Sequence, residues 1–280
     1  MRTAPKCIAI VGLGLMGGSL AAACRKKFRT SRMVGISRSR RALAVARRAR
    51  WIHEGTSDLA VGVRCADLII LCTPVDTFPR LLSTLDRFAK KGALVTDTGS
   101  VKGAILREVD RRPWKKINFV GAHPMTGSHE RGIGAAKPDL YDQGFTFLVR
   151  SRRTDPASFR AVKNFWKKIT PKVVEVKAKE HDRIVAAISH LPHAVAACLV
   201  LSAGKKSISL ASSGFLDTTR IAQGDPSIWF PIFQWNREAL RKSFADFENR
   251  LRKFQRALAP GRTGLLRRIL AEAARKRRQI

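Results

Sequence analysis

The stretch that decides the fold is IAIVGLGLMGGSL, at residues 8–20. An apolar run leads into Gly12, Gly14 and Gly17, which are spaced as G-x-G-x-x-G, and an Ala-rich segment follows. In such a turn the first glycine permits a tight bend, the second lets the backbone approach a pyrophosphate, and the third lets the helix pack against the strand. The sequence therefore predicts a dinucleotide site here, and the alternative is a glycine-rich turn without a ligand.

The segments on either side give the motif the context that it requires. Cys7–Val11 has the pattern of a buried strand, and Ser19–Arg25 has that of a helix. Leu15 and Met16 lie between the second and third glycines, in the turn that leads into that helix, whose N-terminus faces the anion. We count both of them, with the three glycines, as predicted cofactor-binding residues.

The residues after the second predicted strand, Met33–Ile36, bear on which dinucleotide binds. A carboxylate about 20 residues beyond the motif would bind the ribose 2′-hydroxyl of NAD, but no Asp or Glu lies between this strand and Glu54. Two serines and three arginines follow the strand instead: Ser37, Arg38, Ser39, Arg40 and Arg41. Hydroxyl and guanidinium groups suit a 2′-phosphate. The pattern favours NADP over NAD, and the alternative is that these are ordinary surface arginines of a basic chain.

The composition bounds the class of protein. The chain has 280 residues, of which 45% are hydrophobic, so it can bury a core and form two domains. Its 54 Lys and Arg against 21 Asp and Glu give a formal net charge of +33, which attracts nucleic acid, anionic membranes and anionic small molecules alike. The basic residues are spread along the chain without interleaved aromatic residues or a nucleic-acid motif. We therefore expect solvated helix faces and a basic tail, with no specific nucleic-acid partner.

The cysteines and the apolar stretches indicate a soluble, cytoplasmic protein. An odd number of cysteines without a C-x-x-C pair suits reduced, buried thiols; they are Cys7, Cys24, Cys65, Cys72 and Cys198. The six residues before the first strand are too few for a signal peptide. The longest apolar stretch, Ile184–Ala203, contains His190, Pro192 and His193, so we expect a buried helix there and no membrane span.

Strand-like and helix-like segments alternate through the first half, as in a parallel sheet that is covered on both faces. The predicted strands are Cys7–Val11, Met33–Ile36, Leu68–Cys72, Ala93–Thr96, Phe119–Ala122 and Thr146–Val149. Ligands bind at the carboxyl ends of the strands in such sheets. Thr73, Pro74 and Thr98 follow two of these strands and are further candidates for contact with the cofactor.

The second half has a different character. Ser158–Ile169 has the pattern of the last helix of the first domain, and Val173–Val176 that of its final strand; beyond them the pattern is helical only. We therefore predict an α/β Rossmann domain at residues 1–178. An all-helical domain at residues 179–280, ending in a basic tail, follows it.

Five motifs occur in order along the chain: GLGLMGGSL at 12–20, DTGSVK at 97–102, GAHPMTG at 121–127, SHLPH at 189–193 and DTTRIA at 217–222. In this combination the sequence resembles the prephenate and arogenate dehydrogenase family of tyrosine biosynthesis. The resemblance implies a Rossmann domain and a helical dimerisation domain, with the active site in the cleft between them. It also implies oxidative decarboxylation of a cyclohexadienol, prephenate to 4-hydroxyphenylpyruvate or arogenate to tyrosine, with hydride transfer to NADP or NAD.

The resemblance assigns two catalytic residues. His123 matches the catalytic histidine of the family's H-P-M motif, and a neutral imidazole can accept the hydroxyl proton as a carbonyl develops. Ser100 matches the serine of G-S-V-K, which would hydrogen-bond the substrate hydroxyl, the histidine or the nicotinamide amide. A histidine that caps a strand end is the alternative for His123. The alternative for Ser100 is an ST-turn or a helix cap before Val101–Val109, and the same serine could hold both roles.

The resemblance also implies a substrate pocket. Arg220 matches the arginine of T-R-I-A, which pairs with the side-chain carboxylate of the substrate. His190 and His193 share one helix face, and one of them lines the pocket by resemblance; helix packing is the equal alternative for each. Asp217 and Trp229 match positions at the pocket, although Trp229 could equally belong to the core. Two histidines without a third ligand make a poor metal site, so no metal is expected.

One departure from the family concerns His129, which stands where many members have a glutamate, with Glu130 after it. A histidine here could be neutral or cationic, and a cation would disfavour the ammonium group of arogenate. This residue therefore slightly favours prephenate over arogenate as the predicted substrate.

The apolar helices expected within Ile184–Ala203 and Ile228–Leu258 would leave exposed faces in a single chain. We therefore predict a two-fold homodimer in which these helices intertwine.

Two other functions compete with this interpretation. A 3-hydroxyacid dehydrogenase or imine reductase has a similar opening motif and a helical second domain, but it relies on a lysine in the first helix of that domain. Here no lysine lies between Lys179 and Lys205. A non-catalytic basic protein that senses NADP or binds nucleic acid would not need His123, Ser100 and Arg220 together.

Overall fold

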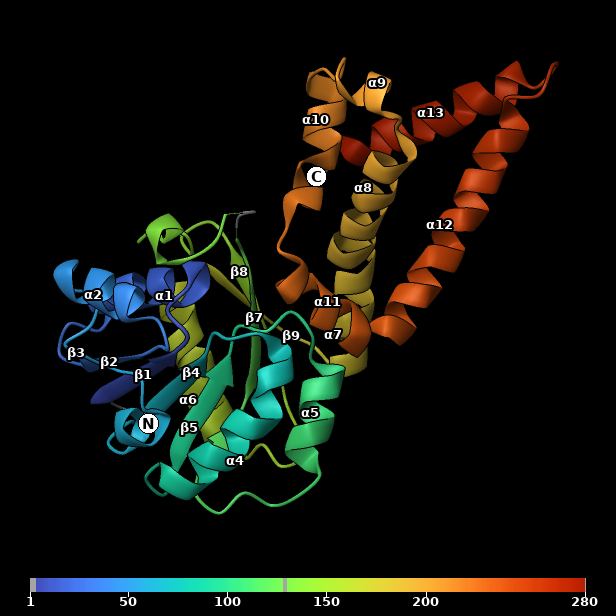
Figure 1. Ribbon diagram of the computed structural model, residues 1–280. Helices are drawn as coiled ribbons and strands as arrows, with labels where there is room; N and C mark the ends of the chain where they lie inside the picture. The colour runs from blue at the N-terminus through green and yellow to red at the C-terminus, as the bar shows by residue number, and fades with distance from the viewer. Residues whose placement is uncertain (1–3, 128–129, 280) are drawn as a thin grey trace.

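The computed structural model describes residues 4–127 and 130–279, which form a sheet-containing part followed by a helical part (Figure 1). The larger sheet is parallel throughout, with the strand order β3-β2-β1-β4-β5-β6. Its strands are β1 (Cys7–Val11), β2 (Arg32–Ile36), β3 (Glu54–Thr56), β4 (Leu68–Leu71), β5 (Ala93–Asp97) and β6 (Ile117–Phe119). The predicted fold class, a Rossmann domain followed by a helical domain, is confirmed.

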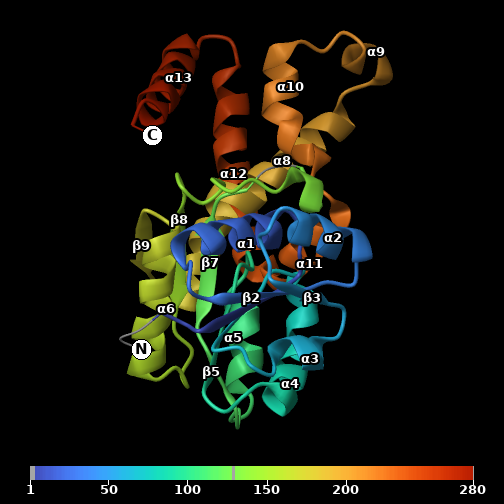
Figure 2. The same ribbon diagram turned by 90° about the vertical axis from the view of Figure 1, so that its left-hand side faces the viewer.

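Helices cover both faces of this sheet (Figures 1 and 2). They are α1 (Leu15–Lys27), α2 (Arg40–Arg48), α3 (Leu59–Val63), α4 (Phe78–Phe88), α5 (Gly103–Asp110) and α6 (Pro156–Ile169). Successive side chains of a strand point to opposite faces. Ile8 and Ile10 of β1 accordingly pack in one core with α1, α2 and α6, whereas Ala9 and Val11 pack in the other with α3, α4 and α5. The sheet is thus buried on both faces, and its carboxyl edge is where a ligand can bind.

A second, three-stranded sheet departs from the predicted topology. It contains β7 (Gly121–Met125), β8 (Phe145–Val149) and β9 (Lys172–Glu175). Strand β7 is antiparallel to β8, and β8 is parallel to β9. The single strand predicted at Phe119–Ala122 is wrong, because β6 ends at Phe119 and β7 begins two residues later. The interruption is Val120 alone, whose N–H still donates to Val95 O (2.9 Å), and one residue is too short a break for an apolar pattern to reveal.

The helical part begins with α7, where the predicted domain boundary after residue 178 falls in the first turn. Its elements are α7 (Ala178–Val185), the π-helical turn η3 (Ala186–His190), α8 (Leu191–Ser202), α9 (Lys205–Ile208), α10 (Ser213–Thr219), the 3₁₀ turn η4 (Arg220–Gln223), α11 (Pro226–Trp235), α12 (Arg237–Ala257) and α13 (Thr263–Arg277). The basic tail is therefore a helix for most of its length. In Figure 1, α12 extends away from the sheet-containing part, and α13 turns back from its far end.

The rod formed by α7, η3 and α8, Ala178–Ser202, is long and apolar enough to cross a membrane by length and composition, a test that core helices of soluble proteins also pass. Only 33% of its most apolar window is buried. The prediction of a buried helix at Ile184–Ala203 is therefore wrong for a single chain. Leu201 at the end of the rod is 85% exposed, and Leu210 shortly after it is 77% exposed. Apolar side chains so exposed are typical of a surface that another chain covers.

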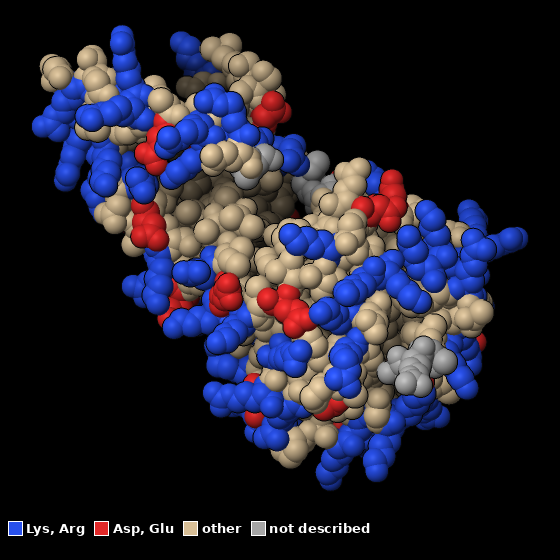
Figure 3. Space-filling view, turned by 180° about the vertical axis from the view of Figure 1, so that it is seen from behind, with Lys and Arg blue, Asp and Glu red and all other residues tan. Residues whose placement is uncertain are grey.

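Two surface properties bear on the predictions from composition. Figure 3 shows lysines and arginines spread over both parts of the face seen from behind, without gathering into one patch. The five cysteines are free thiols, but Cys65 and Cys198 are exposed, so the prediction of buried thiols is wrong for these two.

Candidate active site

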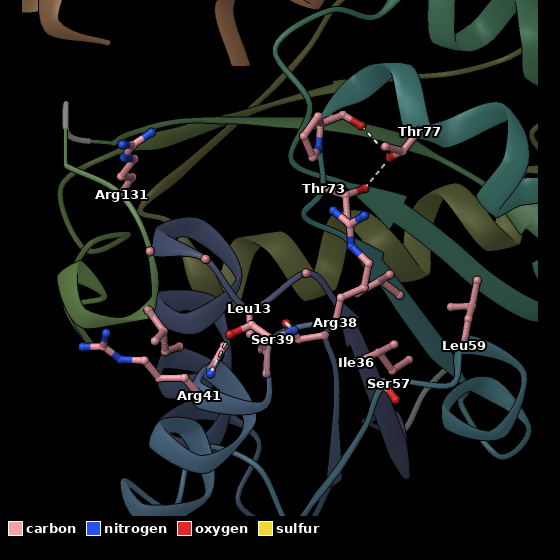
Figure 4. A pocket seen from close by; sticks show the side chains of 18 of the residues that line it. Leu13, Ile36, Arg38, Ser39, Arg41, Ser57, Leu59, Thr73, Thr77 and Arg131 are labelled. Atoms are coloured by element: carbon pink, nitrogen blue, oxygen red, sulfur yellow. Dashed lines mark hydrogen bonds between the residues drawn. The ribbon is translucent and has the colours of Figure 1, made fainter. Parts of the chain in front are cut away.

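A cavity of about 1110 Å³ lies at the carboxyl ends of β1, β2 and β4 (Figure 4). Its wall includes Gly12 and Gly14 from the turn after β1, Ser37, Arg38 and Ser39 from the segment after β2, and Thr73 and Pro74 from the segment after β4. These seven residues were predicted to contact a cofactor. The cavity is where the G-x-G-x-x-G turn predicts a dinucleotide.

The three glycines meet different demands at this turn. Gly12 has a φ of +95°, and a Cβ there would lie 2.8 Å from Cys72 O. A Cβ on Gly17 would lie 1.8 Å from Gly12 O, so this position needs glycine for the helix to pack against the turn. A Cβ on Gly14 would meet nothing within 4 Å. Gly14 therefore leaves space open on the cavity side, as the close approach of a pyrophosphate requires.

The segment after β2 presents both serines and two arginines to the cavity. Arg38 and Arg41 line it, while Arg40, the first residue of α2, does not. Ser39 caps α2 by accepting a hydrogen bond from Ala42 N (3.1 Å), so the backbone N–H groups of this helix also begin at the cavity. Figure 4 shows Arg38, Ser39 and Arg41 extending from this one segment.

Several predicted cofactor residues lie outside the cavity wall. Leu15, Met16, Gly17 and Thr98 do not line it. Leu15 and Gly17 are buried inside α1, and Thr98 lies at the end of β5, where its N–H donates to Leu71 O (3.0 Å). Sequence reasoning also missed Arg80 and Arg131, which line the cavity from α4 and from the segment after β7.

Arg131 connects the two parts of the molecule across the site. It forms an ion pair with Asp225, whose carboxylate caps α11 by accepting a hydrogen bond from Ser227 N (2.9 Å). The rest of its segment is held on α1, because the Tyr141 hydroxyl donates to Met16 O (2.9 Å). A segment fixed to both parts closes one side of the cavity.

His123 lies in the middle of β7, opposite Phe147 of β8, and is buried. Its Nδ1 lies 2.9 Å from Nε2 of His181, on α7. Nδ1 of His181 lies in turn 2.8 Å from Oδ1 of Asp182. The structure thus places a buried carboxylate and two imidazoles in one row, and sequence reasoning had singled out only His123.

A second buried pair supports the same region. Lys102 Nζ donates to Asp97 Oδ2 (2.6 Å) and to Gly99 O (2.8 Å), and both side chains of the pair are fully buried. Asp97 also accepts a hydrogen bond from Ala122 N (2.8 Å), the residue before His123. The last residue of β5 therefore fixes the backbone that carries the histidine.

The environment keeps the histidines neutral. Burial lowers the pKa of His123 well below its ordinary value, and the nearby His181, Lys102 and His190 lower it further. Burial also lowers the pKa of His181, an effect that its hydrogen bond with Asp182 partly opposes. Burial alone would raise the pKa of Asp182, but hydrogen bonds from His181 and from Lys102 N lower it overall. His123 is thus a neutral imidazole, and Asp182 is a carboxylate.

Ser100 is half-exposed at the end of β5, and its hydroxyl makes no hydrogen bond with any other described residue. The alternative role of Ser100 as a helix cap is wrong. Helix α5 begins at Gly103, and Asp182 caps it by accepting hydrogen bonds from Lys102 N (2.9 Å) and Gly103 N (2.8 Å). The Ser100 hydroxyl remains available to a ligand.

His190 and His193 occupy the junction of η3 and α8. Asn236 Nδ2, a donor, lies 3.0 Å from Nδ1 of His190, so that nitrogen accepts and the proton is on Nε2. His190 Nε2 is buried without a hydrogen-bond partner among the described residues, and burial lowers the pKa of His190 to about 4. The ring of His193 stacks on Trp229 with centroids 3.7 Å apart. His190 therefore presents a buried donor, and His193 and Trp229 form one aromatic surface.

The remaining substrate-binding predictions lie on the exposed side of the helical part. Arg220 is exposed at the start of η4, a turn that packs on α8. Asp217 is exposed on α10. His129 lies outside the described residues. Within residues 4–127 and 130–279, no group of three His, Cys, Asp or Glu side chains has the arrangement of a metal site.

Comparisons with known proteins agree along the whole chain. Residues 20–175 match the family described as prephenate dehydrogenase, nucleotide-binding domain, and residues 177–272 match its dimerization domain. A prephenate dehydrogenase of Bacillus subtilis is 33% identical over 258 residues, which are 89% of this chain and 69% of that protein.

Two solved structures are similar in fold over nearly all of both chains. The prephenate dehydrogenase of A. aeolicus, in complex with hydroxyphenyl propionate and NAD+, has a TM-score of 0.90 and 29% identity, covering 100% of this chain and 99% of that one. An arogenate dehydrogenase of Synechocystis has a TM-score of 0.81 and 31% identity, covering 98% and 99%.

Proposed function

The chain belongs to the prephenate dehydrogenase family, and from that premise we propose that it oxidatively decarboxylates prephenate with NADP as its preferred oxidant. It is an NAD(P)-dependent dehydrogenase. The hydroxyacid dehydrogenase and the non-catalytic sensor, which the sequence left open, are not favoured. The observation that carries the proposal is a buried, neutral histidine, His123, on strand β7, whose backbone is hydrogen-bonded to the carboxyl end of β5 in the same part of the molecule that holds the dinucleotide-type cavity.

The residues of the cavity fit a dinucleotide. Positions 12 and 17 require glycine because a Cβ there would clash with the backbone, whereas a Cβ on Gly14 would point into open space. Open space at the second glycine is expected where a pyrophosphate approaches the backbone. Helix α1 has no acidic residue in its first turn and no side-chain cap, so its first N–H groups can face an anion. A coenzyme held by this turn and by the first turn of α1 would supply the hydride acceptor for the ring carbon that bears the hydroxyl.

His123 supplies the acid–base chemistry that this reaction needs. As the C–H electron pair leaves the ring, the hydroxyl proton passes to the neutral imidazole. The electrons of the bond to the departing CO2 make the ring aromatic, and the ring oxygen takes the proton back from His123 to give a phenol. The protein contributes no covalent step, so positioning and one proton acceptor suffice.

NADP is proposed over NAD because of the cavity wall after β2. Arg38 and Arg41 lie there with two serine hydroxyls, and a guanidinium group binds phosphate oxygens through paired hydrogen bonds. Asp76 is the one carboxylate among the described residues of the wall, and it follows β4 instead of β2. The ribose 2′-position of a bound coenzyme is therefore expected to meet cations.

Prephenate is proposed over arogenate on the charge of the substrate pocket. Arg220 is the proposed partner of the side-chain carboxylate that both substrates carry, and the buried His190 Nε2–H is a further donor. His129, which stands where many members have a glutamate, removes the acidic group that an ammonium would prefer. His190 is neutral and adds a hydrogen bond without a charge, so the proposed preference for prephenate rests on the loss of an acidic group at position 129.

The protein is proposed to act as a homodimer in the cytoplasm. Residues 177–272 match a dimerization domain, and the exposed apolar side chains of the helical part support that assembly. The free thiols suit a reducing compartment.

Four parallel assays test the proposal: prephenate or arogenate, each with NADP or NAD, with coenzyme reduction followed at the nicotinamide absorbance band. We expect the highest kcat/KM for prephenate with NADP. A higher kcat/KM with arogenate or with NAD would overturn the corresponding preference. Absence of turnover in all four assays, with folded protein that binds NADP, would overturn the function itself.

A further inference from the structure

His181 is buried between the catalytic histidine and a carboxylate, and no motif singled out in the sequence includes it. Its Nε2 lies 2.9 Å from Nδ1 of His123, and its Nδ1 lies 2.8 Å from Oδ1 of Asp182. Both its ring contacts are edge-on, with His123 at 5.1 Å and with Phe147 at 5.3 Å between centroids. The ring is therefore held in one orientation with both nitrogens engaged.

The direction of the hydrogen bonds in this row follows from Asp182. Its two oxygens already accept the backbone N–H groups of Lys102 and Gly103, so the carboxylate can only accept from His181. Nδ1 of His181 therefore carries the proton, and in a neutral imidazole the other nitrogen is then an acceptor. Nε2 of His181 in turn requires the proton of His123 to lie on Nδ1. The lone pair of His123 is thereby confined to Nε2.

We propose that His181 is a positioning residue, which fixes the tautomer and the ring orientation of His123 so that Nε2 accepts the hydroxyl proton of the substrate. The inference rests on the proposed function, since it assigns how the same base is prepared. As His123 becomes an imidazolium, its Nδ1–H stays bonded to His181, and Asp182 at the end of the row offsets the charge. No proton needs to leave His123 toward His181 in this scheme.

The other charged and titratable groups around the two rings do not change the direction of the hydrogen bonds from His123 to His181 and from His181 to Asp182. Lys102 and Asp97 face the rings from the segment at the end of β5, and they neutralise each other at 2.6 Å. His190 faces them from η3 and is neutral, with a pKa of about 4. Asp182 is thus the anion in direct contact with the row.

Two substitutions of His181 separate positioning from structural support. The amide of His181→Asn falls near the place of Nδ1, so it can still donate to Asp182 but cannot reach His123. The amide of His181→Gln reaches the place of Nε2, so its oxygen can accept from His123 Nδ1–H, while the contact with Asp182 is lost. His181→Asn therefore keeps only the hydrogen bond with Asp182, and His181→Gln keeps only the hydrogen bond with His123.

Positioning predicts that kcat falls in His181→Asn by at least about 50-fold, as expected when a catalytic histidine loses the group that fixes its tautomer, and by less than about 5-fold in His181→Gln. The KM values for prephenate and NADP should change less than about 2-fold, since ground-state binding is untouched. The loss should persist on the alkaline plateau of the pH profile, because a higher pH cannot restore a tautomer. The reverse ranking, with kcat intact in His181→Asn and lowered in His181→Gln, would show that the contact with Asp182 is what matters and would overturn the proposal.

A second measurement needs no variant of His181. Nitrogen NMR of the ¹⁵N-histidine-labelled enzyme with NADP reports which ring nitrogen of His123 is protonated, with His123→Asn identifying the resonances. A protonated Nδ1 and an unprotonated Nε2 are expected near pH 7.5, and the opposite tautomer would overturn the inference. Since the tautomer is read without turnover, this result stands apart from a failure of the proposed reaction in the four assays.

Discussion

The environment of His123 sets the pH dependence of the reaction. Burial holds its pKa well below the ordinary value of 6.5, and only the neutral imidazole accepts the hydroxyl proton. We therefore expect kcat to stay level as pH falls from 8 through 6.5 and to decrease only at lower pH, where His123 becomes protonated. The measurement is kcat with prephenate and NADP between pH 5 and 9.

If the decrease of kcat at low pH, the acid limb of the profile, had its midpoint at or above pH 6.5, the assignment of His123 would be contradicted. The control is His123→Asn, which keeps a hydrogen-bonding side chain but not the base. Its kcat should be lower by about 10²- to 10⁴-fold, the usual contribution of a general base, and the acid limb should disappear. A His123→Asn variant that keeps the limb would mean that another group titrates.

Arg38 and Arg40, on either side of the cap residue Ser39 of α2, offer a matched test of the coenzyme preference. Arg38 lines the cavity, whereas Arg40 lies two residues away and outside the wall. Arg38→Ala should raise the KM for NADP by about 10- to 100-fold, since a charged hydrogen bond contributes about 1.5–3 kcal/mol, and leave the KM for NAD nearly unchanged. Arg40→Ala should change neither. Equal effects of the two variants, or equal effects on both coenzymes, would refute the 2′-phosphate argument.

Individual residues show what a sequence can and cannot reveal about this site. Gly12, Gly14 and His123 lie in motifs whose spacing carries their chemistry, so they could be predicted. His181, on α7, contacts His123 from 58 positions further along the chain, and Asp182 contacts His181. Nothing local in the sequence marks them, since a histidine followed by an aspartate is an ordinary pattern on a helix face.

At the scale of elements, the β1–α1 turn depends on two glycines for opposite reasons. Gly17→Ala would place a Cβ 1.8 Å from Gly12 O, so we expect a lower melting temperature or a failure to fold. Gly14→Ala meets no protein atom within 4 Å, and its φ of −86° suits alanine. This variant should fold with an unchanged melting temperature, but its KM for NADP should rise by about 10-fold or more, because the methyl group occupies the approach of the pyrophosphate.

Thermal unfolding and coenzyme kinetics, measured on both variants, check this contrast. If Gly14→Ala binds NADP normally, the pyrophosphate does not approach the turn as proposed. If Gly17→Ala is as stable as the unsubstituted protein, the packing of α1 on the turn is looser than described.

The elements that sequence patterns missed are those fixed by long-range contacts. The parallel strands β1, β2, β4 and β5 were predicted from apolar runs. Strand β7 was not, because one residue separates it from β6 and its partner β8 begins 20 residues later. The cap of α5 is likewise supplied by Asp182 instead of by Ser100. A local pattern reports its own strand or helix, but not which distant segment completes its hydrogen bonds.

At the scale of the whole molecule, the exposed apolar side chains of the helical part predict the assembly. Light scattering at micromolar concentration should give a mass near 62 kDa, twice the 31.1 kDa of one chain. Replacing both Leu201 and Leu210 with lysine should shift the mass toward the monomer, because these side chains are 85% and 77% exposed in one chain. Val61→Lys, at an exposed apolar position on α3, is the matched control and should leave the dimer intact. A monomeric unsubstituted protein would contradict the dimer.

The central claim is that this chain couples hydride transfer to decarboxylation through His123. The most direct measurement is the stoichiometry of NADPH and CO2 formed from prephenate in a single turnover, with His123→Asn beside it. We predict one CO2 for each NADPH, with 4-hydroxyphenylpyruvate as the product, and a large loss of both in the variant. NADPH formed without CO2 would mean an ordinary hydroxyl oxidation and would contradict the account, as would an unchanged rate in His123→Asn.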